Sequence, residues 1–314
     1  MAQNKAVLQL QQIATSTAEF SRKLLSEVLQ AHEGNLVASP LSAQLVLVLA
    51  QLGARGRTAE QMKVGLALPE DVETVKTGFH ELMESLTRKP DFQNACYKPV
   101  VVEIANRMYV KTGFGIEADF VADVEKTFNS TVESVDFVDP AVRTQINKWV
   151  EEATHDKIKD LIPDDRTKSV VVPFMYQEHF FYYANVESLD AEIIQLPYRS
   201  DQTSLVIVLP KSRTGLAALE AKMKDQNLSD LLKNKSRMRI ELFLPKFKIE
   251  FFINLKPQLQ KMGMSDMFGD SADFSGISPP VPFDPLSVLR VSHVMQKTFI
   301  EIDEQGTEAA SASF

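Results

Sequence analysis

The residues that could carry out catalysis are few, and they form no recognised catalytic pattern. The sequence contains no Gly-x-Ser-x-Gly turn, no glycine-rich phosphate loop and no Cys-x-x-Cys pair. His80-Glu81 lacks the second histidine that a zinc protease motif requires. Cys96 is the only cysteine, which excludes an internal disulfide and a multi-thiolate metal site. We therefore expect a protein that is not an enzyme and that holds no metal or cofactor.

One basic cluster could bind a polyanion, but the whole chain does not favour such a partner. Lys233, Lys235, Arg237 and Arg239 lie close together, and a run of this length is more typical of a helix end and a solvated strand face. The formal net charge is −8, so the composition predicts binding neither to nucleic acid nor to an anionic membrane surface. No stretch reaches the roughly 18 apolar residues of a membrane helix.

The segment from Glu304 to Ser313 is unusual because it combines small side chains with a single glycine. It follows directly on a predicted strand, Thr298 to Ile302. Taken alone, such a segment is typical of a flexible tail. The same small residues can also enter a crowded sheet, with Gly306 as a hinge and Thr307 as a good strand former.

The elements that must position this segment change character along the chain. Apolar spacing predicts helices in the first 90 residues and again at 117–129, 139–161, 216–232 and 255–262. Ser39 is a good N-cap and Pro40 a good first residue for the helix over 43–52, whose composition predicts burial nearly all round. Strands are predicted at 100–110, 132–137, 180–186, 191–197, 204–210, 238–244, 247–252 and 286–302. Grouped helices followed by strands with mixed helices favour one α+β domain over residues 1–314.

At this point the sequence resembles the serpins, the serine protease inhibitor superfamily. Glu304-Gln305-Gly306-Thr307-Glu308-Ala309-Ala310 is similar to the proximal hinge of the family's reactive-centre loop. Asn35 with Ser39-Pro40-Leu41-Ser42 resembles the shutter motif beneath its main sheet. Further matches follow in family order: Ile104-Ala105-Asn106-Arg107-Met108-Tyr109, Ile146-Asn147-Lys148-Trp149-Val150, Lys157-Ile158, Leu196-Pro197-Tyr198, Leu244-Pro245-Lys246-Phe247, Met262-Gly263-Met264 and Asp273-Phe274-Ser275. Gln296 stands where many members have histidine, which favours an arthropod member.

The resemblance implies a fold in which helices surround a large central mixed sheet and an exposed reactive-centre loop. It also implies a suicide substrate for a trypsin- or chymotrypsin-like serine protease, acting as a monomer by insertion of the cleaved loop into that sheet. The residues carried over to the hinge are Glu304, Gly306, Thr307, Glu308, Ala309, Ala310, Ser311 and Ala312. Those carried over to the shutter are Asn35, Ser39, Pro40, Ser42 and Gln296. The scissile bond is not assigned.

The sequence departs from the family pattern at two places. Residues 168–171 join the helix region before them almost directly to residues 172–175. Between these two regions the family has a central strand of the main sheet. That strand is missing from this sequence near 169–170. The chain also stops at Phe314, inside the loop. Because a missing strand would leave its neighbours' backbone groups unpaired, we expect the natural protein to contain both segments or to be a shortened product.

Compartment and mode of action are left between alternatives. Asn129, Asn227 and Asn234 lie in glycosylation sequons, which with family habit favours an extracellular protein; no signal peptide is present in this numbering and a cytoplasmic protein is the alternative. Small hinge residues favour an inhibitor. The other interpretations are a non-inhibitory serpin, such as a carrier, chaperone or decoy substrate, and an inactive truncated serpin.

Overall fold

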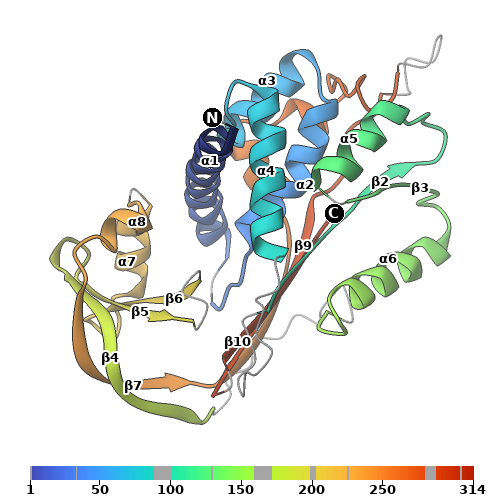
Figure 1. Cartoon of the computed structure of the whole chain (residues 1–314). Helices are drawn as coiled ribbons and strands as arrows, with labels where there is room; N and C mark the ends of the chain where they lie inside the picture. Colours follow the sequence, from blue (N-terminus) through green and yellow to red (C-terminus); the bar gives the residue numbers. More distant parts are fainter. Residues whose placement is uncertain are drawn as a thin grey trace.

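The computed structural model describes the whole chain except residues 1, 33, 88–100, 129, 159–171, 199–202, 225, 280–287 and 305. Helices fill the first part of the chain, as the apolar spacing predicts, and pack together on one side of the molecule (Figure 1). They are α1 (Ala2–Ala31), α2 (Pro40–Gly53), α3 (Gly56–Gly65), α4 (Val72–Thr87) and, after the first strands, α5 (Ala118–Phe128). α3 lies within the first 90 residues, where helices are predicted, although the sequence pattern did not give it a range of its own.

Helix α2 lies at the centre of this helical layer. Ser39 caps it by accepting a hydrogen bond from the backbone N–H of Ser42, and Pro40 takes a position in the first turn, where a missing N–H does no harm. Every residue from 42 to 50 is buried, which confirms the predicted burial all round. An uninterrupted apolar helix of this kind can be stable only inside a core.

Among the described residues, the central sheet has four strands in the order β1 (Val101–Asn106), β10 (Gly306–Ser313), β9 (Met295–Asp303) and β8 (Phe247–Asn254). β10 runs antiparallel to β9, with Gly306 opposite Asp303 and Ser313 opposite Gln296. It runs parallel to β1, with Val101 opposite Glu308 and Asn106 opposite Ser313. The sheet is therefore mixed, and the predicted α+β class with a central mixed sheet is confirmed.

The expectation of an exposed loop is wrong for the part of it that the structure describes. Residues 306–313 form a strand in the interior of the sheet, and Ala310, Ser311, Ala312 and Ser313 are buried. The physical reason is that β1 and β9 lie on either side of this segment, and both offer backbone groups that need partners. The small side chains let the segment fit between them.

A second four-stranded sheet lies apart from the helical layer, in the order β6 (Ser204–Pro210), β5 (Ala191–Pro197), β4 (Phe174–Val186) and β7 (Ser236–Pro245) (Figure 1). The short helices α7 (Leu216–Met223) and α8 (Leu228–Leu231) lie between β6 and β7 in the chain, and α9 (Lys256–Lys261) follows β8. The single helix predicted at 216–232 is wrong, because Asn227 caps α8 as a separate turn. The strand predicted at 286–302 begins only at Met295, and residues 286–287 lie outside the described residues.

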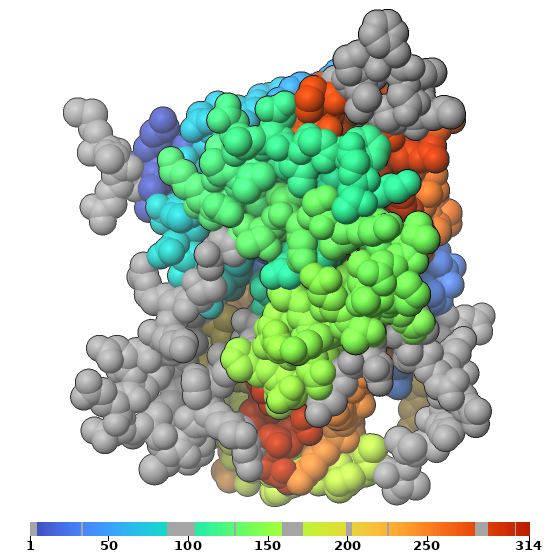
Figure 2. Space-filling view, turned by 90° about the vertical axis from the view of Figure 1, so that its right-hand side faces the viewer, coloured from blue at the N-terminus to red at the C-terminus, as the bar shows by residue number. Residues whose placement is uncertain are grey.

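Helix α6 (Pro140–Ala153) covers the other face of the central sheet. It follows β2 (Met108–Lys111) and β3 (Val132–Val135), which form a parallel pair. Val150 of α6 packs with Ile158, Ala105 of β1, Phe299 of β9, and Ala310 and Ala312 of β10. Figure 2 shows α6 lying across this face, with red residues of the C-terminal segment visible below it. β10 is thus enclosed between α6 and the helical layer that contains α2.

Replacement of Gly78 by alanine tests the close packing of α1 against α4. Alanine favours a helix by about 1 kcal/mol over glycine. A Cβ at this position, however, would lie 2.4 Å from Cγ1 of Ile13 and 3.0 Å from the carbonyl oxygen of Gln9. Overpacking costs about 1–3 kcal/mol, so we expect Gly78→Ala to lower the free energy of unfolding by about 1 kcal/mol. Urea titration measures it; His80→Ala, exposed on the same helix, is the control and should not destabilise.

Candidate functional site

The candidate site is the interior of the central sheet, where the predicted hinge and shutter residues meet. Its first part is a clamp between the start of α2 and β9. The amide oxygen of Gln296 accepts a hydrogen bond from the backbone N–H of Ser39 at 3.0 Å, and its Nε2 donates to the carbonyl oxygen of Ser39 at 2.9 Å. Gln296 is fully buried, so these bonds are shielded from water. They fix the N-terminus of α2 to the sheet.

Ser313 of β10 completes this clamp from the strand beside it. Nε2 of Gln296 donates its second proton to the Ser313 hydroxyl at 3.0 Å, and the Ser313 and Ser42 hydroxyls lie 2.8 Å apart. The Ser42 hydroxyl donates to Oδ1 of Asn106, at the end of β1, at 3.0 Å. Since that uses the only proton of Ser42, Ser313 is the donor to Ser42. The hydroxyl protons of Ser42 and Ser313 and both Nε2 protons of Gln296 have acceptors, so these hydrogen bonds join α2, β1, β9 and β10.

Three of the predicted shutter residues, Ser39, Ser42 and Gln296, are brought together in this network, with Pro40 beside them in the first turn of α2. Asn35 is exposed and lies outside the network. Sequence reasoning did not assign Asn106 or Ser313 to it. Asn106 was visible only as part of a matching motif, and Ser313 only as a small residue near the chain end, so neither carried a signal of the contact.

The hinge end of β10 is held by polar contacts at the opposite end of the strand. Gly306 has φ +140°, a conformation open to glycine and strained for other residues, and its N–H donates to Oδ1 of Asp303 at 3.2 Å. The hydroxyl of Tyr198 donates a hydrogen bond to Oγ1 of Thr307. Burial raises the pKa of Tyr198, which keeps the phenol protonated as a donor. Gly306 and Thr307 therefore start the strand at a defined place.

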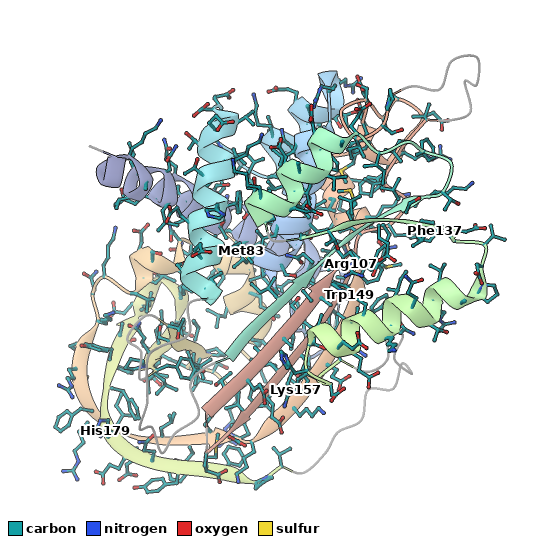
Figure 3. All side chains as sticks on the ribbon, turned by 45° about the vertical axis from the view of Figure 1, so that its right-hand side comes forward. Met83, Arg107, Phe137, Trp149, Lys157 and His179 are labelled. Atoms are coloured by element: carbon teal, nitrogen blue, oxygen red, sulfur yellow. The ribbon has the colours of Figure 1, made fainter. Side chains whose placement is uncertain are left out.

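Two ion pairs involve the predicted hinge glutamates. Nζ of Lys157 lies 2.7 Å from Oε2 of Glu308, which ties β10 to the segment after α6. Lys246, between β7 and β8, pairs with Glu304, and this hydrogen bond lowers the pKa of the Glu304 carboxyl. Figure 3 shows Lys157 beside the strands of the central sheet.

Successive side chains of β10 point to opposite faces of the sheet. Ala310 and Ala312 pack under α6, while Ser311 and Ser313 are the matching positions on the other face. The hydroxyls of Ser311 and Thr298, directly opposite each other on β10 and β9, are both buried without a hydrogen-bond partner among the described residues. A longer side chain at any of the four buried positions of β10, residues 310–313, would clash with side chains that already fill the core. The size of the residues is thus what makes the segment fit.

Aromatic rings surround the end of β10. Phe314 makes an edge contact with Tyr109 of β2, with ring centres 6.4 Å apart, and Tyr109 makes another with Trp149 of α6 at 6.3 Å. The Arg107 guanidinium lies 4.4 Å from the centre of the Trp149 ring (Figure 3). Burial raises the pKa of Tyr109 to about 12. Trp149 therefore packs against both Tyr109 and Arg107.

The remaining candidate residues lie away from this site. Asn227 and Asn234 are exposed, and Oδ1 of Asn227 accepts the N–H of Ser229, which leaves its Nδ2 on the surface. Asn129 and Cys96 lie outside the described residues. Within the described part of the chain, no three His, Cys, Asp or Glu side chains gather in a way that could hold a metal ion. In that same part, no helix has the length and apolar character needed to cross a membrane.

Comparison with known protein families shows which family this chain belongs to. The family model described as serpin (serine protease inhibitor) matches residues 15–171 and 164–314. The chain belongs to the serpin family. The two matched segments overlap at 164–171, and the place where the sequence departs from the family pattern lies within this overlap. The family is described as one of serine protease inhibitors, and similar chains are named antichymotrypsin and antitrypsin, which confirms the prediction that this chain is not an enzyme.

Similar serpins come from several animals. Ipis-1 of Ixodes persulcatus is 34% identical over 321 residues, which cover 89% of this chain and 81% of that protein. Antichymotrypsin-2 of Bombyx mori is 29% identical over 334 residues, with coverage of 94% and 85%. The solved structure of cleaved Serpin 42Da has a TM-score of 0.82 at 32% identity and covers 97% of this chain and 89% of that one. Emu ovalbumin, at 24% identity and a TM-score of 0.81, shares the fold.

Replacement of Gln296 by methionine tests the buried clamp. Methionine keeps the volume but leaves both Ser39 backbone groups and the Ser313 hydroxyl without this partner. Each unsatisfied buried group costs about 1–3 kcal/mol, so we expect Gln296→Met to lower the free energy of unfolding by about 3 kcal/mol. Denaturant titration measures the loss. Gln258→Met is the matched control, since the buried Oε1 of Gln258 has no hydrogen-bond partner among the described residues; equal losses for the two variants would contradict the role of the clamp.

The Glu304–Lys246 pair predicts a pH-dependent contribution to stability. Because the folded pKa of Glu304 lies below its ordinary value of 4.5, the contribution is present above that value and is lost as the pH falls through the folded pKa. We expect the melting temperature of the wild type to exceed that of Glu304→Gln at pH 7, and the two to converge as the pH falls below the folded pKa of Glu304. A difference that is independent of pH would show that the ion pair is not its source.

Proposed function

We propose that this serpin inhibits a trypsin- or chymotrypsin-like serine protease by inserting its reactive-centre loop into the central sheet as strand β10. The observation that carries the proposal is the position of residues 306–313, which pair along their length with β9 on one side and largely with β1 on the other. The gap between β1 and β9 and the small residues of β10 that fill it match in shape. Relatives named as antitrypsin and antichymotrypsin support the class of target.

The chain's own residues provide the free-energy difference that such a mechanism requires. While the segment is outside the sheet, Gln296 and Ser42 lose their contacts with Ser313, and the facing edges of β1 and β9 lose their ladder partners. Insertion restores the ladder and buries Ala310 and Ala312 under α6. A loop held outside is therefore kinetically trapped above a more stable inserted form. A protease joined to the loop by an ester bond would be carried along by this movement.

A second candidate function rests on the same strand. If β10 is the resting position of the segment, the chain offers no mobile hinge and acts as a non-inhibitory or inactive serpin. The polar network at Ser313 favours this reading because it is complete. The two functions differ in what a protease produces: a covalent complex in the first case, and either no reaction or clean cleavage in the second.

The extracellular location and the use of the exposed sequons belong to this proposal too. Asn227 and Asn234 are exposed, which is a requirement for glycosylation. If the sequons are glycosylated, enzymatic removal of N-glycans lowers the mass of the protein secreted by insect cells.

Thr307→Arg is the variant that tests inhibition by insertion. Thr307 is half-buried in contact with Tyr198, so arginine would place a charge where the strand must enter the sheet. We expect the wild type to form a complex with trypsin or chymotrypsin that survives SDS, and Thr307→Arg to lose at least nine-tenths of it and to be cleaved as a substrate. Thr214→Arg, on an exposed turn, is the control and should inhibit like the wild type. Cleavage of the wild type without a complex would support the second function.

A further inference from the structure

Glu308 is the one charged residue of strand β10, and its place in the sheet is unfavourable by itself. It points to the side of the sheet that α6 covers, because Ala310 and Ala312 further along the strand pack with Val150 of that helix. Its direct cross-strand neighbour on β9 is Glu301. Carboxylates that are directly opposed on neighbouring strands repel each other. The segment that fills the sheet therefore brings an acid to a position where another acid already lies.

Cations on the same face of the sheet counter this repulsion. Nζ of Lys157 lies 2.7 Å from Oε2 of Glu308, beside the central strands (Figure 3). Lys248 of β8 is the cross-strand neighbour of Glu301 on its other side. The two ammonium groups also lie near the ring of Phe299, at 5.9 Å and 5.0 Å from its centre. Lys248 belongs to the sheet itself, whereas the contact between Lys157 and Glu308 exists only when β10 is in place.

The backbone around Lys157 is fixed by contacts that do not involve β10. Its N–H donates to the carbonyl oxygen of Thr154 at 3.0 Å, and the N–H of Ile158 donates to Oγ1 of Thr154 at 3.1 Å. His155 and Asp156, just before it, have φ values of +47° and +64°, a conformation that residues other than glycine adopt rarely. Such a conformation persists only where the surrounding structure holds it. The turn after α6 thus holds Lys157 over the sheet.

From these contacts we infer that Lys157 is the positioning residue for strand β10, and that it selects a carboxylate at position 308. The inference rests on the proposed function, because it concerns the segment as it enters the sheet. The turn between β9 and β10 places Gly306 opposite Asp303, so pairing of the two strands starts there. Glu308 is then the first charged side chain to reach the sheet. Lys157 attracts it into the register opposite Glu301, where it is otherwise repelled.

The same contact discriminates against neighbouring registers. A shift of β10 by two residues keeps each side chain on its own face of the sheet, so the alternation of small residues alone does not prevent it. Such a shift would place Gly306 or Ala310 beside Lys157, and neither can pair with an ammonium group. Ser313 marks the correct register at the far end of the strand. Glu308 marks it at the hinge end, where pairing begins.

Charge reversal tests this pairing in the full chain without any protease. Lys157→Glu gathers three carboxylates at one place, so we expect the equilibrium constant for unfolding in urea to rise about tenfold. Adding Glu308→Lys restores opposite charges and should return the constant to within about twofold of the wild type. Lys148→Glu, which reverses an exposed charge on α6, is the control and should change the constant by less than about twofold. A double variant no more stable than Lys157→Glu overturns the inference, as do equal effects of Lys157→Glu and Lys148→Glu.

A milder pair of variants decides the question if charge reversal prevents folding. Glu308→Gln removes the carboxylate with little change of shape. In the wild-type background it should raise the unfolding constant, because the contact with Lys157 is lost. In a Lys157→Met background it should lower the constant, because only the repulsion from Glu301 is removed. A change of the same sign in both backgrounds overturns the inference.

Reaction with trypsin and chymotrypsin separates this inference from the proposed function. The ratio of SDS-stable complex to cleaved chain should fall about fivefold in Lys157→Glu and be kept in Lys157→Arg, because slower entry gives water more time to hydrolyse the ester to the protease. If the wild type forms no complex, the proposed function fails, and the urea cycle alone decides whether Lys157 positions β10. A wild type that forms complex while Lys157→Glu gives the same ratio overturns the inference and leaves the proposed function standing.

Discussion

The central constraint in this molecule is the requirement of two strand edges for the same partner. β1 and β9 flank a gap one strand wide, and their backbone groups lie between α6 and the helical layer, where water cannot satisfy them. Whatever fills the gap must supply a backbone ladder on both sides and side chains small enough for both faces. Residues 306–313 meet both conditions, since they pair with each neighbour and present alanine to α6 and serine to α2.

The polar network at Ser313 turns this fit into a specific position. A strand of alanines alone could shift its register by two residues with little loss of stability, because its two faces would be nearly uniform. Ser313 fixes the register because only at that position does a hydroxyl meet both Gln296 and Ser42. The same contacts secure the capped start of α2, so the helical layer and the sheet share one set of hydrogen bonds. At the other end, Tyr198 and Lys157 hold Thr307 and Glu308.

Local patterns predicted most elements, because helix spacing, the Ser39-Pro40 cap and the apolar, β-branched runs of β5 and β6 depend on neighbours in sequence. The hinge and shutter residues could be assigned because the family motifs stand in this sequence in order. What the sequence did not reveal are the contacts that Asn106 and Ser313 make with Ser42 and Gln296. These four residues come from distant segments, and no pattern within the segments of Asn106 and Ser313 signals the contacts. The prediction of an exposed loop was wrong for a related reason. Small residues suit both a loop and a crowded strand, and the choice between them is made by the edges of β1 and β9, which lie elsewhere in the chain.

The connection between β9 and β10 has a consequence for the order in which the chain folds. Gly306 pairs with Asp303 across a tight turn, so this hairpin needs almost no loop closure and such hairpins form in roughly 1–10 μs. The pairing of β10 with β1 joins residues about 200 positions apart, and contacts of that sequence separation form late. A serpin that keeps its loop outside must therefore complete the rest of its sheet before the hairpin closes. In this chain, formation of the turn between β9 and β10 competes with long-range assembly of the sheet. The turn forms first because it needs almost no loop closure.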